Sequence, residues 1–147
     1  MFQKWAIQNR MSDPADFGYL VRPLPANAKS LSAIVQGVLV HSDWLAAYGL
    51  TTDRALSRET LPVAERLRQV LTLDSSTLDV QRSPEKRVPA TCRDYALMLC
   101  SFLRSKGTPA RLRCGFASYL GGNAWEDHWV FEYRNTHTNQ WQLADAQ

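Results

Sequence analysis

Apolar side chains recur at spacings of three and four residues in three stretches of the chain, and this pattern predicts three helices. The first helix is expected over residues 27–39, the second over residues 61–71 and the third over residues 92–106. Gly107 and Pro109 end the third, because glycine favours the position after a helix and proline cannot extend one. The candidate N-terminal caps are Asn27 or Ser30, Ser57 or Thr60, and Thr91, in that order.

Three strand candidates follow the third helix. They cover residues 110–117, 125–133 and 140–145, and the turn signal Gly121-Gly122-Asn123 separates the first two. Helices followed by an antiparallel sheet of consecutive strands indicate an α+β domain, in which the helices pack on one face of the sheet.

The other segments carry weaker signals. A short strand is expected over residues 19–22, among the turns of the N-terminal segment, and a short helix over residues 44–48, ending at Gly49. Residues 74–90 are polar and contain two prolines, so we expect a long loop there. Loops of that length in compact domains are often functional.

Cys92 stands in the first turn of the third predicted helix, directly after its cap. The backbone N–H groups at this end lack helical partners, and the positive end of the helix dipole favours an anion. We therefore expect the thiolate, the reactive form of cysteine, to be stabilised there. The same N–H groups can stabilise the oxyanion that forms when a thiolate attacks a carbonyl.

His128 and Asp145 fall on neighbouring predicted strands. A hairpin register that sets His128 opposite Asp145, with residues 134–139 as the loop, places both side chains on one face of the sheet. The carboxylate can then accept the imidazole N–H and fix the tautomer of the ring. The other ring nitrogen remains for the thiol of Cys92, so the three residues form a candidate catalytic triad.

Four segments surround these residues: R-V-P-A-T-C-R-D-Y-A-L-M-L-C (87–100), S-K-G-T-P-A-R-L-R-C-G-F (105–116), W-E-D-H-W-V-F-E-Y (125–133) and W-Q-L-A-D-A-Q (141–147). Together they resemble the transglutaminase-like superfamily, which includes papain-fold transglutaminases, peptide N-glycanases and many bacterial proteins. The resemblance covers roughly residues 85–147. It implies a papain-like core in that region, with the cysteine-bearing helix packed on the sheet, and a helical lead-in over residues 1–84.

By this resemblance Cys92 is the nucleophile, His128 is the general base and then the general acid, and Asp145 orients the imidazole. Animal protein-crosslinking transglutaminases carry glutamine and tryptophan beside the cysteine, where this chain has Thr91 and Arg93. Protein crosslinking is therefore not implied. The expected activity is acyl transfer from an amide or peptide bond to water or to an amine, without a cofactor or a metal ion.

Two other classes of function remain open. A binding module can keep the fold without the activity and recognise a peptide in the same cleft. A metal site formed by Cys92, His128 and Asp145 is less favoured, because a thiol–imidazole pair already accounts for these residues. Asp94 and Asp127 flank the motifs and are interpreted as supporting or surface groups.

Several residues near the motifs have structural interpretations. Cys100 and Cys114 sit in apolar patterns and are expected to be buried. His41 follows an apolar helical stripe and is expected near the C-terminal end of that helix. Trp125 and Trp129 suit two roles equally, as walls of a cleft for the acyl group or as core residues.

Composition excludes several classes of partner. The net charge of +3 is small and the basic residues are scattered, which argues against nucleic-acid binding. The longest apolar run is too short to span a bilayer, and the first ten residues lack a secretory signal pattern. Three cysteines without paired spacing argue against a disulfide framework, so a reducing cytoplasm is the expected setting. The expected partner is a peptide, protein or small amide substrate.

The sequence ends two residues after Asp145, inside a predicted strand. Domains of the family that it resembles usually continue beyond this aspartate. A single domain over residues 1–147 that lacks its C-terminal part is therefore expected. Its last strand is expected to fray and to hold His128 loosely, and the exposed sheet edge is expected to favour self-association.

Overall fold

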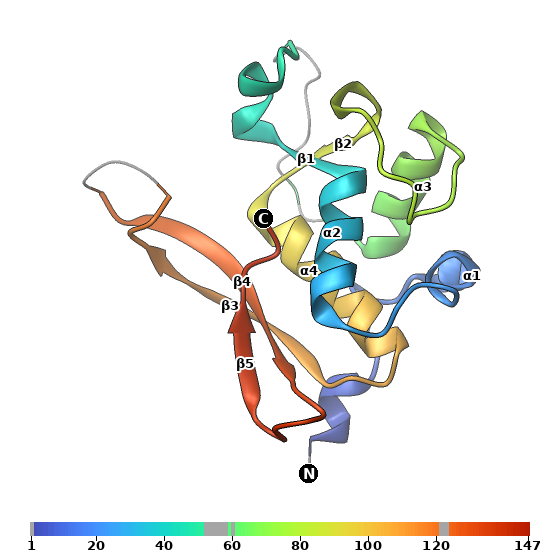
Figure 1. Ribbon diagram of the computed structural model, residues 1–147, viewed down its shortest axis with the longest axis vertical. Helices are drawn as coiled ribbons and strands as arrows, with labels where there is room; N and C mark the ends of the chain where they lie inside the picture. Colours follow the sequence, from blue (N-terminus) through green and yellow to red (C-terminus); the bar gives the residue numbers. More distant parts are fainter. Residues whose placement is uncertain (1, 52–58, 60, 121–123) are drawn as a thin grey trace.

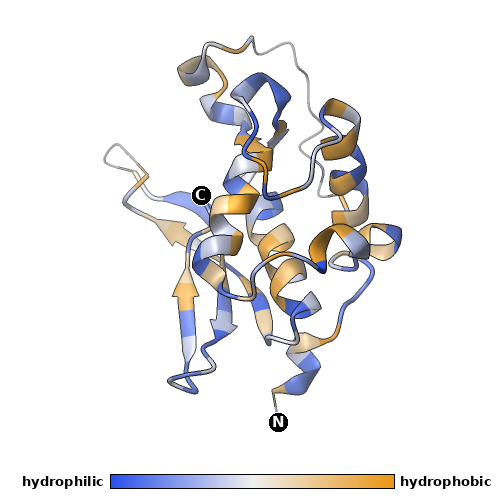
Figure 2. Ribbon diagram, turned by 45° about the vertical axis from the view of Figure 1, so that its right-hand side comes forward, coloured by the Kyte–Doolittle hydropathy of each residue, from blue (hydrophilic) through white to orange (hydrophobic). Residues whose placement is uncertain are grey.

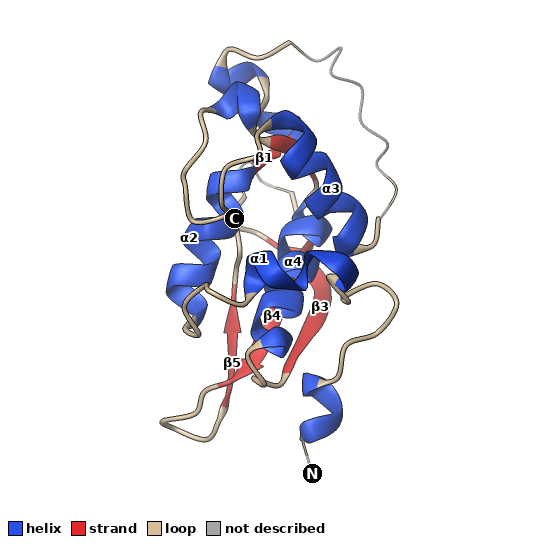
Figure 3. Ribbon diagram, turned by 90° about the vertical axis from the view of Figure 1, so that its right-hand side faces the viewer, coloured by secondary structure: helices blue, strands red, loops and turns tan. Residues whose placement is uncertain are grey.

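The computed structural model describes residues 2–51, 59, 61–120 and 124–147. Its α-helices are α1 (Gly18–Val21), α2 (Ala28–Val38), α3 (Val63–Leu73) and α4 (Cys92–Ser105), and its strands are β1 (Leu39–His41), β2 (Val88–Ala90), β3 (Ala110–Ala117), β4 (Glu126–Arg134) and β5 (Trp141–Ala144). The helices lie on one side of the antiparallel sheet β3-β4-β5, and β1 and β2 form a separate parallel pair (Figures 1 and 3). The domain is α+β, as the order of its predicted elements indicates.

Helix α4 is the central element of the fold. All ten residues from Asp94 to Leu103 are buried, and α4 contacts α2 and α3 on one side and β3 and β4 on the other. A helix buried over this length is enclosed by protein around its whole circumference. Figure 2 shows the resulting distribution of hydropathy, with apolar residues gathered on the interior helices and polar residues on the loop between β4 and β5. The Cys92 end of α4 is thereby fixed against both layers.

Helices α2 and α3 start close to their predicted positions. The side chain of Asn27 caps α2 by accepting the backbone N–H of Ser30 at 2.8 Å, which confirms the first of its two candidate caps. Pro62 precedes α3, while the candidate caps Ser57 and Thr60 lie outside the described residues. Both helices turn apolar side chains to the core that they share with α4.

Three of the weaker expectations were wrong or incomplete. Residues 19–22, expected as a strand, lie mostly in the one-turn helix α1, which a run of four residues is too short to reveal. The expected helix over residues 44–48 is a pair of 3₁₀ turns, Ser42–Trp44 and Ala46–Tyr48, which ends at Gly49 in the left-handed region, with φ 71°. The expected loop over residues 74–90 ends in β2, which pairs with β1 from a distant part of the chain.

The register of the β4–β5 hairpin differs by two residues from the predicted one. Glu132 pairs with Leu143, and His128 is not opposite Asp145. The loop between the strands covers residues 135–140 instead of the expected 134–139, and the Asn135 N–H donates to Gln140 O at 2.9 Å, which closes the turn. A shift of two residues leaves every side chain on its predicted face. Asp145 consequently lies beyond the end of β5.

The strands of the sheet are longer than the helical layer that covers them. Ala110 at the start of β3 is fully buried, whereas Phe116 near its end is 74% exposed. Figure 1 shows this end of the β3–β4 hairpin projecting away from the helices. Cys114 lies in the projecting half and is exposed, so the expectation that it is buried was wrong. β3 and β5 are the edges of the described sheet, and self-association through them stays a prediction.

Within the part of the chain that the structure describes, no helix has the length and apolar character needed to cross a membrane.

Candidate active site

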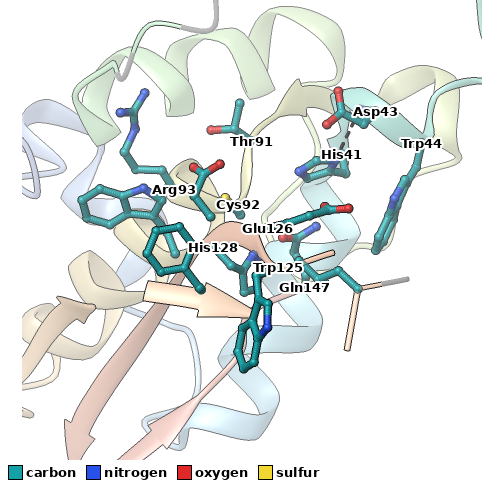
Figure 4. A pocket seen from close by; sticks show the side chains of 14 residues that line it. His41, Asp43, Trp44, Thr91, Cys92, Arg93, Trp125, Glu126, His128 and Gln147 are labelled. Carbon is teal, nitrogen blue, oxygen red and sulfur yellow. Dashed lines mark hydrogen bonds between the residues drawn. The ribbon is translucent and has the colours of Figure 1, made fainter. Parts of the chain in front are cut away.

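A pocket of about 720 Å³ opens at the N-terminal end of α4 (Figure 4). Its walls come from four places in the chain: the end of β1 and the turn after it (residues 41, 43 and 44), the start of α4 (residues 91–93), the β3–β4 hairpin (residues 116, 120 and 125–129), and Gln147. Cys92 and His128 both line this pocket. The structure therefore brings the predicted nucleophile and the predicted base to one cavity.

The start of α4 is held by a buried network. The carboxylate of Asp94 accepts the backbone N–H of Thr91 at 2.9 Å and its hydroxyl at 3.1 Å. The same carboxylate receives two hydrogen bonds from the guanidinium of Arg66 on α3, at 2.9 and 3.2 Å. Both side chains of this ion pair are almost fully buried. The network fixes the turn that carries Cys92.

Asp94 is thus more than a surface group, and Arg66 is a supporting residue that the sequence pattern missed. The apolar spacing of the α3 segment suggested only hydrophobic partners for the core. The available signal was the motif Thr91-x-x-Asp94, in which a carboxylate at the third helical position faces the cap. Nothing in the motif indicates which cation pairs with it.

The resting thiol of Cys92 is not the pre-formed thiolate that its helix position suggests. Burial raises the pKa of the Cys92 thiol above its ordinary value, and the negative charges of Asp127 and Asp145 raise it further. Hydrogen bonds to the backbone N–H groups of Trp129 and Arg93 act in the opposite direction. Because desolvation disfavours the charged form, the protonated thiol dominates near neutral pH.

The alkylation rate of Cys92 by iodoacetamide is accordingly expected to increase with pH beyond the range where an ordinary cysteine has levelled off. A raised pKa leaves a smaller thiolate fraction at pH 7, and that fraction grows until the pH passes the raised pKa. The measurement is the rate of Cys92 modification against pH in a Cys114→Ser variant, which removes the exposed competing thiol. A rate that is already constant from pH 6 upward would contradict this expectation.

The other two cysteines differ in accessibility. Cys100 is buried in α4, as expected, and burial raises the pKa of its thiol to about 12. Cys114 is exposed on β3. Selective labelling of Cys92 over Cys114 therefore depends on the chemistry of the pocket and not on exposure alone.

His128 and Asp145 form a hydrogen-bonded pair. The distance between His128 Nε2 and Asp145 Oδ2 is 2.7 Å, and the imidazole is 4% exposed. When His128 is neutral, its Nε2 carries the hydrogen that the carboxylate accepts, so Nδ1 is the nitrogen left to receive a proton. The pairing of His128 with Asp145 is the one that was predicted, but Asp145 reaches the imidazole from beyond the end of β5 and not as its cross-strand neighbour.

The residues around Asp145 are well anchored, contrary to the expected fraying. The side chain of Ala146 is buried in the core, and its carbonyl accepts a hydrogen bond from Gln36 Nε2 on α2 at 3.2 Å. The backbone N–H of Gln147 donates to Asp145 Oδ1 at 3.1 Å. These contacts hold the carboxylate beside His128.

The opposite wall of the pocket contains residues whose place the sequence did not indicate. His41 was expected at a helix end, but it ends β1, and its Nδ1 accepts the backbone N–H of Asp43 at 3.3 Å (Figure 4). The rings of His41 and Trp44 lie with their centroids 5.3 Å apart. The pairing of His41 with Ala90 between β1 and β2 brings this wall to the start of α4. Pairing between such distant segments leaves no local pattern in the sequence.

Trp125, directly before β4, and Trp129 within β4 both line the pocket, which is one of the two roles predicted for them. Trp125 is 69% exposed, so it belongs to the cavity wall and not to the core. Trp129 packs against the core and also lines the pocket, with the guanidinium of Arg93 over its ring at 5.9 Å. Asp127 is an exposed member of the same wall.

Among the described residues, no group of three or more His, Cys, Asp or Glu side chains is arranged to hold a metal ion.

A protein-family model described as the transglutaminase-like superfamily matches residues 54–146, well over half of the chain. The chain belongs to the transglutaminase-like superfamily. This superfamily is largely one of cysteine-based acyltransferases and peptidases. The transglutaminase-like match begins well before the first of the motifs at residue 87, so it includes α3 and Arg66 as well as the core. No curated protein and no solved structure matches the chain.

Proposed function

We propose that this transglutaminase-like domain is a cysteine-dependent acyl-transfer enzyme that acts on amide or peptide bonds of a peptide, a protein or a small amide. Cys92 is the nucleophile, His128 is the proton carrier and Asp145 orients it. The observation that carries the proposal is the 2.7 Å hydrogen bond between His128 Nε2 and Asp145 Oδ2, which leaves Nδ1 available in the pocket of Cys92.

The first half of the reaction forms an acyl-enzyme. The thiol of Cys92 gives its proton to Nδ1 of His128, and the sulfur attacks the carbonyl carbon of the amide. The carbonyl oxygen gains negative charge, which the N–H groups at the start of α4 are placed to stabilise. The C–N bond then breaks, and His128 returns its proton to the leaving amine. The product is a thioester on Cys92 and a free amine.

The second half of the reaction releases the acyl group. Water or an amine attacks the thioester, and His128 Nδ1 takes the proton of the attacking group. The carbon–sulfur bond breaks, and the sulfur recovers a proton from His128. The products are a carboxylic acid or a new amide, together with the free enzyme. Asp145 stabilises the imidazolium in both halves without becoming protonated.

Burial of Cys92 is consistent with this scheme. A protonated thiol is poorly nucleophilic by itself, so the proton must be transferred to His128 as the reaction begins. The imidazolium–thiolate pair formed in this way is stabilised by the carboxylate of Asp145, which is already in place. In this scheme the Cys92 thiol is therefore activated by its pairing with His128, and not by the N-terminal end of α4 alone.

The raised pKa of the Cys92 thiol also favours one other function. If the proton is never transferred, the domain is an inert module that binds a peptide in the same pocket. This alternative predicts binding without turnover.

A screen of amide and peptide substrates, with and without added primary amines, tests the proposal. We expect turnover with the natural sequence, none with Cys92→Ala, and a mass increase on the peptide that contains Cys92 when a slow substrate is quenched in acid. Cys114→Ser is the matched control and is expected to keep full activity, because Cys114 lies outside this pocket. Turnover that persists in Cys92→Ala would exclude the mechanism, and substrate binding without any thioester would favour the inert module.

A further inference from the structure

The carboxylate of Asp145 has a partner besides His128. The hydroxyl of Tyr119 donates to Asp145 Oδ2 at 2.9 Å, the same oxygen that lies 2.7 Å from His128 Nε2. The ring of Tyr119 also meets the imidazole of His128 edge to face, with the centroids 5.9 Å apart and the planes at 89°. One tyrosine therefore contacts both members of the pair.

We propose that Tyr119 is a positioning residue for the His128–Asp145 pair: its hydroxyl fixes the orientation of the carboxylate, and its ring covers one side of the imidazole. This inference rests on the proposed function, because a positioned imidazole matters for catalysis only if His128 carries the proton of Cys92.

The hydrogen bonds of Asp145 leave its carboxylate little freedom to rotate. Oδ1 accepts the backbone N–H of Gln147, and Oδ2 accepts donors from both Tyr119 and His128. Each of these is a hydrogen bond to a charged group, which is roughly twice as strong as one between neutral groups. The plane of the carboxylate is thereby set toward His128 Nε2.

Tyr119 is suited to act as a permanent donor. Partial burial raises the pKa of its hydroxyl to about 12, and the hydrogen bond to Asp145 and the charge of that carboxylate contribute to the rise. The hydroxyl therefore stays protonated across the physiological range. Its side chain is 66% exposed overall, so the hydrogen bond is not explained by core packing.

Tyr119 and His128 share a second hollow besides the pocket of Cys92. His128 lines the pocket of Cys92 and also this hollow of about 350 Å³ on the outer face of the sheet, whose wall includes Tyr119. The ring of Tyr119 packs edge to face on the imidazole, which is 4% exposed. We expect removal of the ring to let water in this hollow reach His128.

The hydroxyl has an electrostatic effect that a purely structural contact lacks. By donating to Oδ2 it offsets part of the negative charge of the Asp145 carboxylate. The other charged or titratable groups that line the two hollows around His128 are Cys92, His41, Asp43, Arg93, Glu126 and Asp127 on one side, and Arg113, Cys114 and Glu132 on the other. None of these is altered by a change at Tyr119.

Nuclear magnetic resonance of His128 tests the proposal without a substrate. We expect Tyr119→Phe to broaden the low-field proton resonance of His128 Nε2–H, because the carboxylate that accepts this proton then lacks the hydroxyl that fixes its orientation. The spectra are recorded in a Cys92→Ala background, and the broadened resonance is expected to remain visible in Tyr119→Phe, which keeps the ring. It is expected to disappear through exchange with water in Tyr119→Ala. Tyr19→Phe, at an exposed tyrosine of α1, is the matched control and is expected to leave the resonance unchanged.

A resonance as sharp in Tyr119→Phe as in the parent Cys92→Ala protein, or one that survives in Tyr119→Ala, would overturn the positioning role. The proposed function fails separately, if His128→Ala leaves the alkylation rate of Cys92 unaltered. The backbone amide spectrum reports whether each variant is folded, and Tyr119→Phe retains the shape of the natural residue in case Tyr119→Ala does not fold.

Discussion

Replacing His128 with alanine is expected to slow acyl transfer between about 10²- and 10⁴-fold. The imidazole lines the pocket of Cys92, and its Nε2 is held by Asp145 at 2.7 Å. Without it, the half-buried thiol loses the acceptor that the proposed mechanism assigns to its proton, and the leaving amine loses its donor. The measurement is the single-turnover rate of thioester formation with a substrate from the screen, supported by the rate of Cys92 alkylation.

His137→Ala is the matched control for this loss. His137 lies exposed in the loop between β4 and β5, away from the pocket, where its backbone N–H donates to Asn135. The control is expected to retain the natural rate. Equal rates for His128→Ala and the natural sequence, with both proteins folded, would remove His128 from the mechanism.

Replacing Asp94 with alanine is expected to reduce the free energy of unfolding by about 3–5 kcal/mol. The change leaves the buried guanidinium of Arg66 without its carboxylate and takes the hydrogen-bond acceptor from the backbone N–H of Thr91. Leaving one buried charge without its partner destabilises the fold by more than the intact ion pair stabilises it. For a domain of this size, the melting temperature is expected to fall by roughly 10 °C or more.

The control for Asp94→Ala is Arg68→Ala on the solvent side of α3, which breaks the exposed pair between Arg68 and Glu65. Water already solvates both of these groups, so no measurable change in the melting temperature is expected. Thermal unfolding followed by circular dichroism compares the two variants. If the two variants have the same melting temperature, the buried network does not hold α4 as described.

Local patterns predicted the elements of the catalytic core well. The start of α4 at Cys92 follows from the Thr91 cap and from the apolar spacing after it, and Gly107 ends the helix region at φ 76°. The alternation in residues 125–133 placed His128 and Phe131 on opposite faces of β4, and Phe131 is fully buried. Propensity, capping and alternation are properties of neighbouring residues, so the sequence displays them directly.

The features that the sequence did not reveal depend on contacts between distant residues. The hairpin register is decided by how the loop closes at Gln140, and the exposure of Cys114 depends on where the helical layer stops above β3. The pairing of β1 with β2 and the ion pair between Arg66 and Asp94 each join segments far apart in the chain. The candidate triad was predictable because its residues sit within recognisable motifs, whereas the partners Tyr119, Arg66 and His41 do not.

The walls of the Cys92 pocket come from β1, the start of α4, the β3–β4 hairpin and the end of the chain, and this has a consequence during biosynthesis. Asp145 and its anchor Ala146 follow the other pocket-lining elements in the chain, with Gln147 alone after them, so the pair between Asp145 and His128 can form only once those elements have been synthesised. Until then Cys92 has no oriented imidazole to take its proton. Under the proposed mechanism an incompletely folded chain is therefore unreactive, and Cys92 becomes an effective nucleophile only when the native topology is complete.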